Sequence, residues 1–298
     1  MTSLLELRGL RARFPGPDGP VEVLRGVDLD VAAGEKVALV GESGSGKSVT
    51  ARAVLRLDRD ADLEGRVALD GTDLLALPDR AMRDVRGARI GLVFQDPLAS
   101  LNPVMTIGWQ IMQPLLIRGV RKKEARRRGV ELLGRLGVRD ADRRFDDYPH
   151  QFSGGMRQRV VIAIAVIAEP ALLIADEPTT ALDVRVQAQV LTLLRELAAE
   201  RSMSVLLITH DLGIVAGFAD RVVVMRDGVP VEHGPVDDIY ARPQHPYTRG
   251  LLASVPRIDD DPSRRLSTRE DAADADAPAA DAPAADPSAA EVLEGGGR

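Results

Sequence analysis

The most constraining stretch of the sequence is a glycine-rich loop, Gly41 to Ser48, between an apolar run and a helix-compatible segment. Val37 to Val40 predict a buried strand before the loop, and Val49 to Leu57 predict a helix after it. The loop has the pattern G-x-x-x-x-G-K-[ST], which binds polyphosphates when it lies between a strand and a helix. The alternative, a flexible turn that binds nothing, would not require this flanking strand and helix. Glycines let backbone N–H groups approach phosphate oxygens, and a helix N-terminus adds positive potential. Lys47 supplies a cation for the outer phosphates, and the Ser48 hydroxyl supplies a ligand for Mg²⁺.

Polar side chains follow two further predicted strands at the point where each strand ends. Gln95 follows the apolar run Ile90 to Phe94, and Asp176 and Glu177 follow Ala171 to Ala175. Open α/β sheets bind ligands at the carboxyl ends of their strands, so these side chains are candidates for one site. Two adjacent carboxylates at a strand end suit Mg²⁺ coordination and water activation. Taken alone, Gln95 is more typical of an ordinary surface glutamine.

A second candidate anion site begins at Phe152 to Gln158, which opens a predicted helix. Ser153 is placed to be the N-cap, and Gly154 and Gly155 leave backbone N–H groups exposed behind it. Because the glycine loop already provides one phosphate site, this second site must serve another nucleotide or the far side of the same one.

The amino-terminal region carries three short apolar runs, Leu4 to Leu7, Val21 to Leu24 and Val27 to Val31. With the turn residues between them, they predict short antiparallel strands and hairpins. Phe14 is either a residue of this sheet or an aromatic face on which an adenine ring stacks. The runs themselves favour the first interpretation.

Helical periodicity covers Thr106 to Gly137, including the basic runs Arg121 to Lys123 and Arg126 to Arg128. Such runs usually form a solvated helix face, and we interpret them in that way. Two further apolar runs, Val222 to Met225 and Val229 to Glu232, are joined through Asp227 and Gly228. They predict a β-hairpin.

Composition excludes several classes of function. The chain has 298 residues and no cysteine, which excludes disulfides, thiolate metal sites and cysteine nucleophiles. Its longest apolar run, Val160 to Ala168, is far shorter than the roughly 20 residues of a membrane-spanning helix. The net charge is −6, but residues 259–298 hold 11 acidic residues and 4 arginines, so the remainder is near neutral. Without a strongly basic domain, nucleic-acid binding is not expected.

Taken in order, these motifs resemble those of an ATP-binding cassette (ABC) ATPase over residues 1–257. Two positions differ from the family's commoner residues. Met156 stands where many members have glutamine, and Phe14 stands where the adenine-stacking residue is more often tyrosine. The motifs are Gly41 to Ser48, similar to Walker A; Gln95, the Q-loop; Ser153 to Met156, the signature; Leu172 to Glu177, Walker B; Ala181 to Asp183, the D-loop; and His210, the H-loop.

The resemblance implies a P-loop NTPase of ABC type, an α/β fold with a mixed central sheet. It further implies an antiparallel β-subdomain and an inserted helical subdomain at about 96–168. Residues 241–257 are expected to form a branch-specific C-terminal segment of the ATPase domain. Residues 258–298 are an acidic tail rich in Ala, Asp and Pro, which we expect to be disordered because it has little apolar surface to bury.

Three longer segments narrow the resemblance to the dipeptide/oligopeptide/nickel importer branch. They are Phe94 to Pro103, Tyr148 to Arg159 and His245 to Leu252. Some members of this branch carry a cysteine cluster near the carboxyl terminus. The absence of cysteine here excludes such an iron–sulfur centre.

In the mechanism that the resemblance implies, two cassettes pack head to tail and sandwich ATP between them. Glu177 would be the general base, His210 would position the γ-phosphate and the attacking water, and Lys47 and Gln95 would complete the catalytic set. Ser48, Gln95 and Asp176 would hold Mg²⁺, while Ser153, Gly154, Gly155 and Met156 would bind the partner's ATP and Asp183 would lie in the D-loop. The ATP-binding residues would be Phe14, Gly41, Glu42, Ser43, Gly44, Ser45, Gly46, Lys47, Ser48 and Val49.

The resemblance also implies partners: two integral membrane permeases, a second ABC ATPase that is identical or homologous, and an extracytoplasmic solute-binding protein within the complex. The chain would lie at the cytoplasmic face of the plasma membrane as a peripheral subunit. It would energise the import of peptides or a related small solute. The alternatives are an ABC exporter subunit and, less favoured, a soluble ABC ATPase without a transport role.

Overall fold

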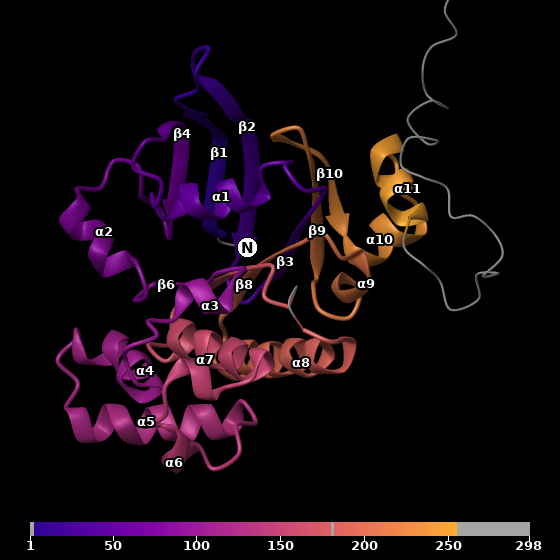
Figure 1. Cartoon of the computed structure of the whole chain (residues 1–298). Helices are drawn as coiled ribbons and strands as arrows, with labels where there is room; N and C mark the ends of the chain where they lie inside the picture. Colours follow the sequence, from indigo (N-terminus) through magenta and orange to yellow (C-terminus); the bar gives the residue numbers. More distant parts are fainter. Residues whose placement is uncertain (1–2, 180–181, 255–298) are drawn as a thin grey trace, which may run out of the picture.

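The structure is a computed structural model that describes residues 3–179 and 182–254. The described strands form a four-stranded sheet, in the order β2-β1-β4-β5, and a six-stranded sheet, in the order β10-β9-β3-β8-β7-β6 (Figure 1). The predicted acidic tail, 258–298, lies outside the described residues.

The four-stranded sheet is antiparallel and is built mainly from one long hairpin, β1 (Ser3–Phe14) and β2 (Val21–Ala32). Strand β4 (Asp62–Leu69) pairs with β1, and β5 (Thr72–Asp73) pairs with β4. The prediction of antiparallel pairing is confirmed, but the division into separate short strands is wrong. Gly9 and Gly26 adopt positive φ, 56° and 109°, and the register shifts beside them let each strand continue through the break in the apolar pattern.

The six-stranded sheet is mixed and supplies the edge at which the predicted site residues lie. Strands β3 (Lys36–Val40), β8 (Ser204–Thr209), β7 (Leu172–Asp176) and β6 (Ile90–Val93) are parallel, and β9 (Arg221–Arg226) runs parallel to β3. Strand β10 (Val229–Pro235) turns back antiparallel to β9, which confirms the predicted hairpin. Every residue of β7 and β8 is buried, as expected for parallel strands covered on both faces.

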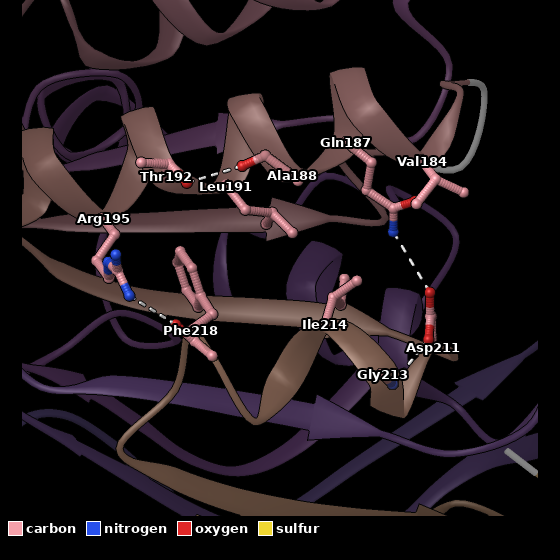
Figure 2. A pocket seen from close by; sticks show the side chains of 11 residues that line it. Val184, Gln187, Ala188, Leu191, Thr192, Arg195, Asp211, Gly213, Ile214 and Phe218 are labelled. Carbon is pink, nitrogen blue, oxygen red and sulfur yellow. Dashed lines mark hydrogen bonds between the residues drawn. The ribbon is translucent and has the colours of Figure 1, made fainter. Parts of the chain in front are cut away.

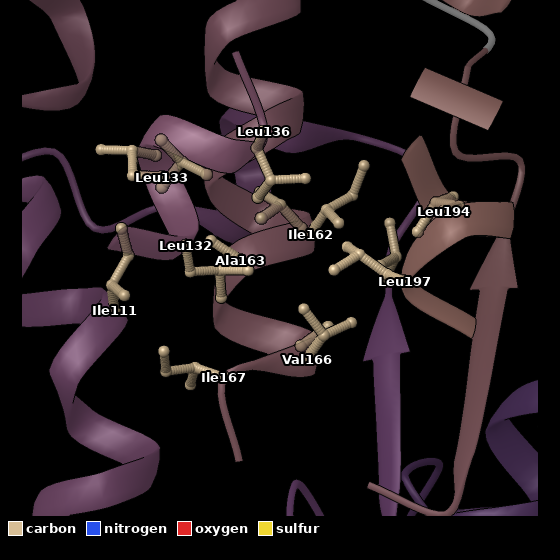
Figure 3. Packing of buried hydrophobic residues seen from close by; sticks show 14 of the residues in the cluster. Ile111, Leu132, Leu133, Leu136, Ile162, Ala163, Val166, Ile167, Leu194 and Leu197 are labelled. Carbon is tan, nitrogen blue, oxygen red and sulfur yellow. The ribbon is translucent and has the colours of Figure 1, made fainter. Parts of the chain in front are cut away.

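Helices inserted between β6 and β7 form a separate layer below the sheets in Figure 1. Their apolar side chains pack together and against α8 (Val184–Glu200), as Ile111, Leu133, Ile162 and Leu197 illustrate in Figure 3. The helices lie within the predicted helical subdomain, 96–168, whose status as a unit stays a prediction. They are α3 (Pro97–Ser100), α4 (Ile107–Leu116), α5 (Lys122–Arg135), α6 (Ala141–Arg144), the 3₁₀ turn Pro149–Gln151 and α7 (Gly154–Val166).

The basic run on α5 is only partly the solvated face that its sequence predicts. Arg127 and Arg128 pair with Glu124 on the exposed surface of the same helix. Arg126 instead forms ion pairs with α6 and the segment after it, and its guanidinium lies 5.0 Å from the centre of the buried Phe145 ring. Arg126 therefore joins two elements of the helical layer, because Arg can stack on a ring while it donates to carboxylates.

The remaining helices flank the sheets. Helices α1 (Lys47–Val54) and α2 (Asp79–Val85) follow β3 and β5, and α9 (Leu212–Val215) follows β8. Helices α10 (Val236–Ala241) and α11 (Pro246–Ala253) lie beside β10 at the C-terminal end of the described chain (Figure 1). None of the helices in the described ranges is both long enough and apolar enough to cross a membrane.

Candidate active site

The glycine loop leaves the carboxyl end of β3 and ends at the first turn of α1, as its sequence predicts. Two of its glycines are required by their surroundings. At Gly41, with φ 153°, a Cβ would lie 2.1 Å from the carbonyl oxygen of Met225. Gly46, with φ 101°, is the N-cap of α1, and a Cβ there would lie 2.8 Å from a Leu24 methyl group. A side chain at either position would displace the loop from the sheet.

The Lys47 ammonium is held against the loop from which it arises. Its Nζ donates to the carbonyl oxygens of Gly41, at 2.9 Å, and Glu42, at 2.6 Å, and lies 3.4 Å from Ser45 Oγ. Lys47 is only 5% exposed, and this burial lowers its pKa, against the opposing charges of Glu177 and Asp176. The loop thus carries a preorganised, weakly solvated cation beside its backbone N–H groups, which suits binding of a polyphosphate.

Ser48 and Asp176 meet across α1 and β7. Ser48 Oγ donates to Asp176 Oδ1 at 2.9 Å, and Asp176 is 6% exposed. Burial raises the pKa of the Asp176 carboxyl, because little solvent stabilises its charged form. A hydroxyl and a carboxylate beside a phosphate loop form the oxygen-rich donor set that Mg²⁺ binds together with substrate phosphates, so these residues fit that ion.

Glu177 is the centre of a polar network that joins three parallel strands. Gln95, two residues beyond β6, donates from Nε2 to Glu177 Oε2 at 2.9 Å. His210, directly after β8, has Nδ1 3.0 Å from Glu177 Oε1, and because a carboxylate oxygen only accepts, Nδ1 carries the proton. The Glu177 side chain is 13% exposed, and its backbone has φ 46° and donates to the carbonyl oxygen of Ile208. The strained turn and the two side chains together fix the orientation of this carboxylate.

The predicted signature residues lie on a different layer from the glycine loop. Ser153 is exposed and is the N-cap of α7 as predicted, although its side chain accepts no hydrogen bond from the first turn of that helix. Helix α7 packs against α3, α4, α5 and β6, whereas α1 packs against β2 and β7. Gly155 is close-packed, since a Cβ there would lie 3.0 Å from Val186 Cγ1. Within one chain, the structure does not bring the two predicted anion sites together.

The other predicted residues occupy ordinary structural positions. Phe14 ends β1 and is half-buried against the core of the antiparallel sheet, and Val49 packs against the same core from α1. Met156 is half-buried against the helical layer. Asp183 caps α8 by accepting from the backbone N–H groups of the first turn, while Ala181 lies outside the described residues. Ser43 and Gly44 are exposed at the tip of the glycine loop.

A groove of about 400 Å³ lies beside the site, between α8 and α9 (Figure 2). It is lined by none of the predicted nucleotide-binding residues, so it is distinct from the phosphate loop. Among its lining residues, Gln187 donates to Asp211 at 3.4 Å, and Arg195 donates to the carbonyl of Gly217 at 2.9 Å. These bonds tie the helix that follows Asp183 to the segment that follows His210.

Sequence reasoning missed one contact to the glycine loop. The hydroxyl of Tyr247, on α11, accepts a hydrogen bond from the backbone N–H of Glu42 at 3.0 Å. From sequence, the segment His245 to Leu252 is distinguished only by its family resemblance. No spacing in the sequence could connect positions 205 residues apart.

Comparison with known proteins identifies the family. Residues 24–180 match the family described as ABC transporter. The chain belongs to the ABC transporter family. As an ABC ATPase it is an ATP-hydrolysing enzyme, which confirms the sequence prediction. Its residues 231–280 also match the family described as oligopeptide/dipeptide transporter, C-terminal region, so the predicted branch is confirmed as well.

Two curated relatives and one solved structure resemble this ABC ATPase closely. A protein of Brucella abortus (strain 2308), provisionally named a peptide import ATP-binding protein, is 53% identical over 264 residues, which cover 88% of this chain and 80% of the relative. The dipeptide transport ATP-binding protein DppD of Lactococcus lactis subsp. cremoris (strain MG1363) is 48% identical over 268 residues, covering 89% and 77%. A dimeric post-hydrolysis state of the ATP-binding cassette MJ0796, bound to ADP and Pi, matches with a TM-score of 0.71 and 30% identity, covering 78% of this chain and 98% of that chain. The predicted ABC fold class is thereby confirmed.

Proposed function

We propose that the chain is the ATP-hydrolysing subunit that energises the import of peptides, or of a related small solute, through partner membrane permeases. The proposal is supported by relatives named for peptide import and dipeptide transport, and by the matching C-terminal region. Neither the exporter alternative nor a soluble ABC ATPase without a transport role has a comparable observation in its favour.

The observation that carries the catalytic proposal is the Glu177 carboxylate, held by Gln95 and His210 at the sheet edge where the glycine loop also begins. Glu177 would accept a proton from the attacking water, because its two hydrogen bonds aim the carboxylate while leaving it an acceptor. His210 would position this water and the γ-phosphate, and Lys47 would neutralise charge on the outer phosphates.

The site is suited to a divalent cation as well as to ATP. Ser48, Gln95 and Asp176 would hold Mg²⁺, which supplies neutralisation of the charge that develops on the phosphate oxygens. The nucleotide would lie along Gly41 to Val49, with its base near Phe14. Within this chain, Ser48 donates to Asp176, so the hydroxyl and the carboxylate lie side by side.

We further propose that each ATP site is completed by a second cassette. Ser153, Gly154, Gly155 and Met156 would bind the γ-phosphate of ATP held by the partner's glycine loop, with Asp183 at the boundary between the two. Support comes from the separation of α7 and α1 within one chain and from the dimeric cassette that this fold resembles.

The composite site can be tested by mixing two inactive variants. Lys47→Ala removes the phosphate cation but keeps the signature, and Ser153→Arg blocks the signature but keeps the loop. Mixed dimers contain one site with both halves intact, so mixing should restore ATP hydrolysis that neither variant shows alone. Mixtures that stay inactive under conditions in which the wild type dimerises would contradict completion by a partner.

The transport role requires the assembled complex. We expect the chain at the cytoplasmic face of the membrane, bound to two permeases and to a second ATPase, identical or homologous, with an extracytoplasmic solute-binding protein delivering the solute. The complex should be purified from its own membranes through a tag on this chain, reconstituted into vesicles and supplied with ATP. The proposal predicts ATP-dependent accumulation of short peptides, abolished by Glu177→Gln. Co-purification with ribosomes or DNA in place of permeases would contradict it.

A further inference from the structure

The C-terminal helix α11 contacts the glycine loop through the side chain of Tyr247. The hydroxyl of Tyr247, in the second position of that helix, accepts from the backbone N–H of Glu42 at 3.0 Å. This N–H belongs to the first peptide of the loop, immediately after β3. A residue late in the chain therefore contacts the backbone that begins the proposed phosphate site.

The peptide that Tyr247 holds is also the one that holds Lys47. The carbonyl oxygen of Gly41, in the same peptide group as the N–H of Glu42, accepts from Lys47 Nζ at 2.9 Å. The described peptide bonds include no cis bond, so this carbonyl and this N–H point in opposite directions. The three groups thus form a chain from the Tyr247 hydroxyl, through one rigid peptide plane, to the Lys47 ammonium. Consecutive hydrogen bonds of this kind strengthen one another by polarisation.

Tyr247 is itself fixed by its neighbours. The guanidinium of Arg226, at the end of β9, lies 5.1 Å from the centre of its ring. The start of α11 is held by His245, whose Nδ1 accepts from the backbone N–H of Tyr247 at 3.2 Å. Glu232 on β10 accepts from the backbone N–H groups of Gln244 and His245 at 2.7 and 3.1 Å. The ring therefore has little freedom to move away from the loop.

The turn between β9 and β10 supports the loop from the same side. The backbone N–H of Gly228 donates to the carbonyl of Ser45 at 3.0 Å, and the carbonyl oxygen of Met225 packs against Gly41. These are backbone contacts that no substitution removes cleanly. The contact from Tyr247 is made by a side-chain hydroxyl, so it can be deleted with the loss of one oxygen atom.

We propose that Tyr247 is a positioning residue for ATP binding, acting through the Gly41–Glu42 peptide to aim the Lys47 ammonium at the phosphates. This inference rests on the proposed function, because it assumes that the loop binds ATP. Without the hydroxyl, the peptide can rotate and its carbonyl is a weaker, less directed acceptor for Lys47. The cation must then be oriented when the nucleotide binds, at a cost to affinity. Once bound, the phosphates hold Lys47 in place, so turnover at saturating ATP is preserved.

The test compares Tyr247→Phe with Tyr240→Phe in the full-length protein. Tyr240, on α10 of the same C-terminal region, donates its hydroxyl to the carbonyl of Leu212 and makes no hydrogen bond to the loop in the described structure. Both variants lose one hydroxyl bond to a backbone group, so they control for general loosening of this region. ATP affinity is measured by calorimetric titration, KM and kcat by steady-state hydrolysis, and folding by thermal denaturation.

The expected result is a dissociation constant and KM for ATP raised roughly threefold to tenfold in Tyr247→Phe, the range for one neutral hydrogen bond, with kcat within about twofold of wild type. Tyr240→Phe should bind ATP like the wild type while losing a similar amount of thermal stability. Wild-type affinity in Tyr247→Phe, or an equal loss of affinity in both variants, would overturn the inference. Absence of ATP binding by the wild-type protein would instead refute the proposed function on which it rests.

Discussion

The hydrogen bond between His210 and Glu177 makes a quantitative prediction about catalysis. Replacing His210 with Ala removes the Nδ1–H donor that lies 3.0 Å from Glu177 Oε1 and leaves the bond from Gln95 to the other carboxylate oxygen. The carboxylate then keeps one of these two bonds and can swing out of line. The loss should appear in the chemical step, because His210 makes no hydrogen bond to the glycine loop in the described structure.

The expected magnitude follows from the charge on the acceptor. A hydrogen bond to a charged group contributes about 1.5–3 kcal/mol, and about 1.4 kcal/mol corresponds to a factor of ten in rate. The variant His210→Ala should therefore lower kcat by roughly 10-fold to 150-fold. Its dissociation constant for ATP should change by less than about threefold, because Lys47 and its loop contacts are untouched.

The assay is ATP hydrolysis by wild type and variant, combined with direct titration of ATP. The matched control is His233→Ala, an exposed histidine on β10, which should leave both quantities unchanged. In a Glu177→Gln background, His210→Ala should lower kcat by a smaller factor than in the wild type, because the part of its effect that passes through the Glu177 carboxylate is already lost. The reasoning would be refuted by unchanged kcat, or by a loss in ATP affinity as large as the loss in rate.

Two further predictions concern stability. Burial raises the pKa of the Asp176 carboxyl in the folded protein. The free energy of unfolding therefore falls as pH rises from the unfolded pKa, about 3.9, through the folded pKa. The variant Asp176→Asn, whose side chain can still accept from Ser48, should not show this loss of stability. Without nucleotide, the melting temperature of Asp176→Asn should exceed that of the wild type at pH 7, and the difference should shrink toward pH 4. The variant should also lose the Mg²⁺-dependent stabilisation by ATP. A difference in melting temperature that does not vary with pH would contradict a raised pKa for Asp176. Gly108→Ala should destabilise the helical layer by about 1–3 kcal/mol or more, because its Cβ would lie 2.0 Å from the Phe145 ring and 2.5 Å from the Phe145 carbonyl oxygen. The control is Gly134→Ala, also within a helix, where the added Cβ would lie 3.9 Å from its nearest neighbour. It should be neutral or stabilising in the same thermal denaturation. Equal effects of the two variants would show that the clash at Gly108 does not cause the destabilisation.

The parts of the fold that could be predicted from sequence are those fixed by local pattern. The continuous apolar run Ala171 to Ala175 forms the buried strand β7, and the periodic pattern within Thr106 to Gly137 forms helices α4 and α5. A strand buried on both faces and a helix buried on one face leave different hydrophobic patterns in the sequence. The long strand Val21–Ala32 was predicted as two pieces, since a local pattern cannot show that a bulge at Gly26 preserves pairing.

For the candidate site, the sequence could predict which residues lie at the carboxyl edge but not how they pair. Glu177 and Gln95 follow different strands, and their adjacency depends on β6 lying next to β7, which only the sheet order determines. The contact between Tyr247 and Glu42 is further from prediction, because it depends on where α11 packs against the end of β3. The position of Arg126 could not be predicted either, because a basic run in the sequence does not show which of its residues packs on an aromatic ring.

The most direct test of the account is the variant Glu177→Gln, which keeps the size and shape of the side chain but removes its ability to take a proton at neutral pH. The decisive measurement is hydrolysis in a single turnover by protein saturated with ATP and Mg²⁺. We predict ATP affinity within about threefold of wild type and a hydrolysis rate at least roughly 100-fold lower, as expected for the loss of a general base. Hydrolysis at the wild-type rate by this variant would contradict the central role given to Glu177.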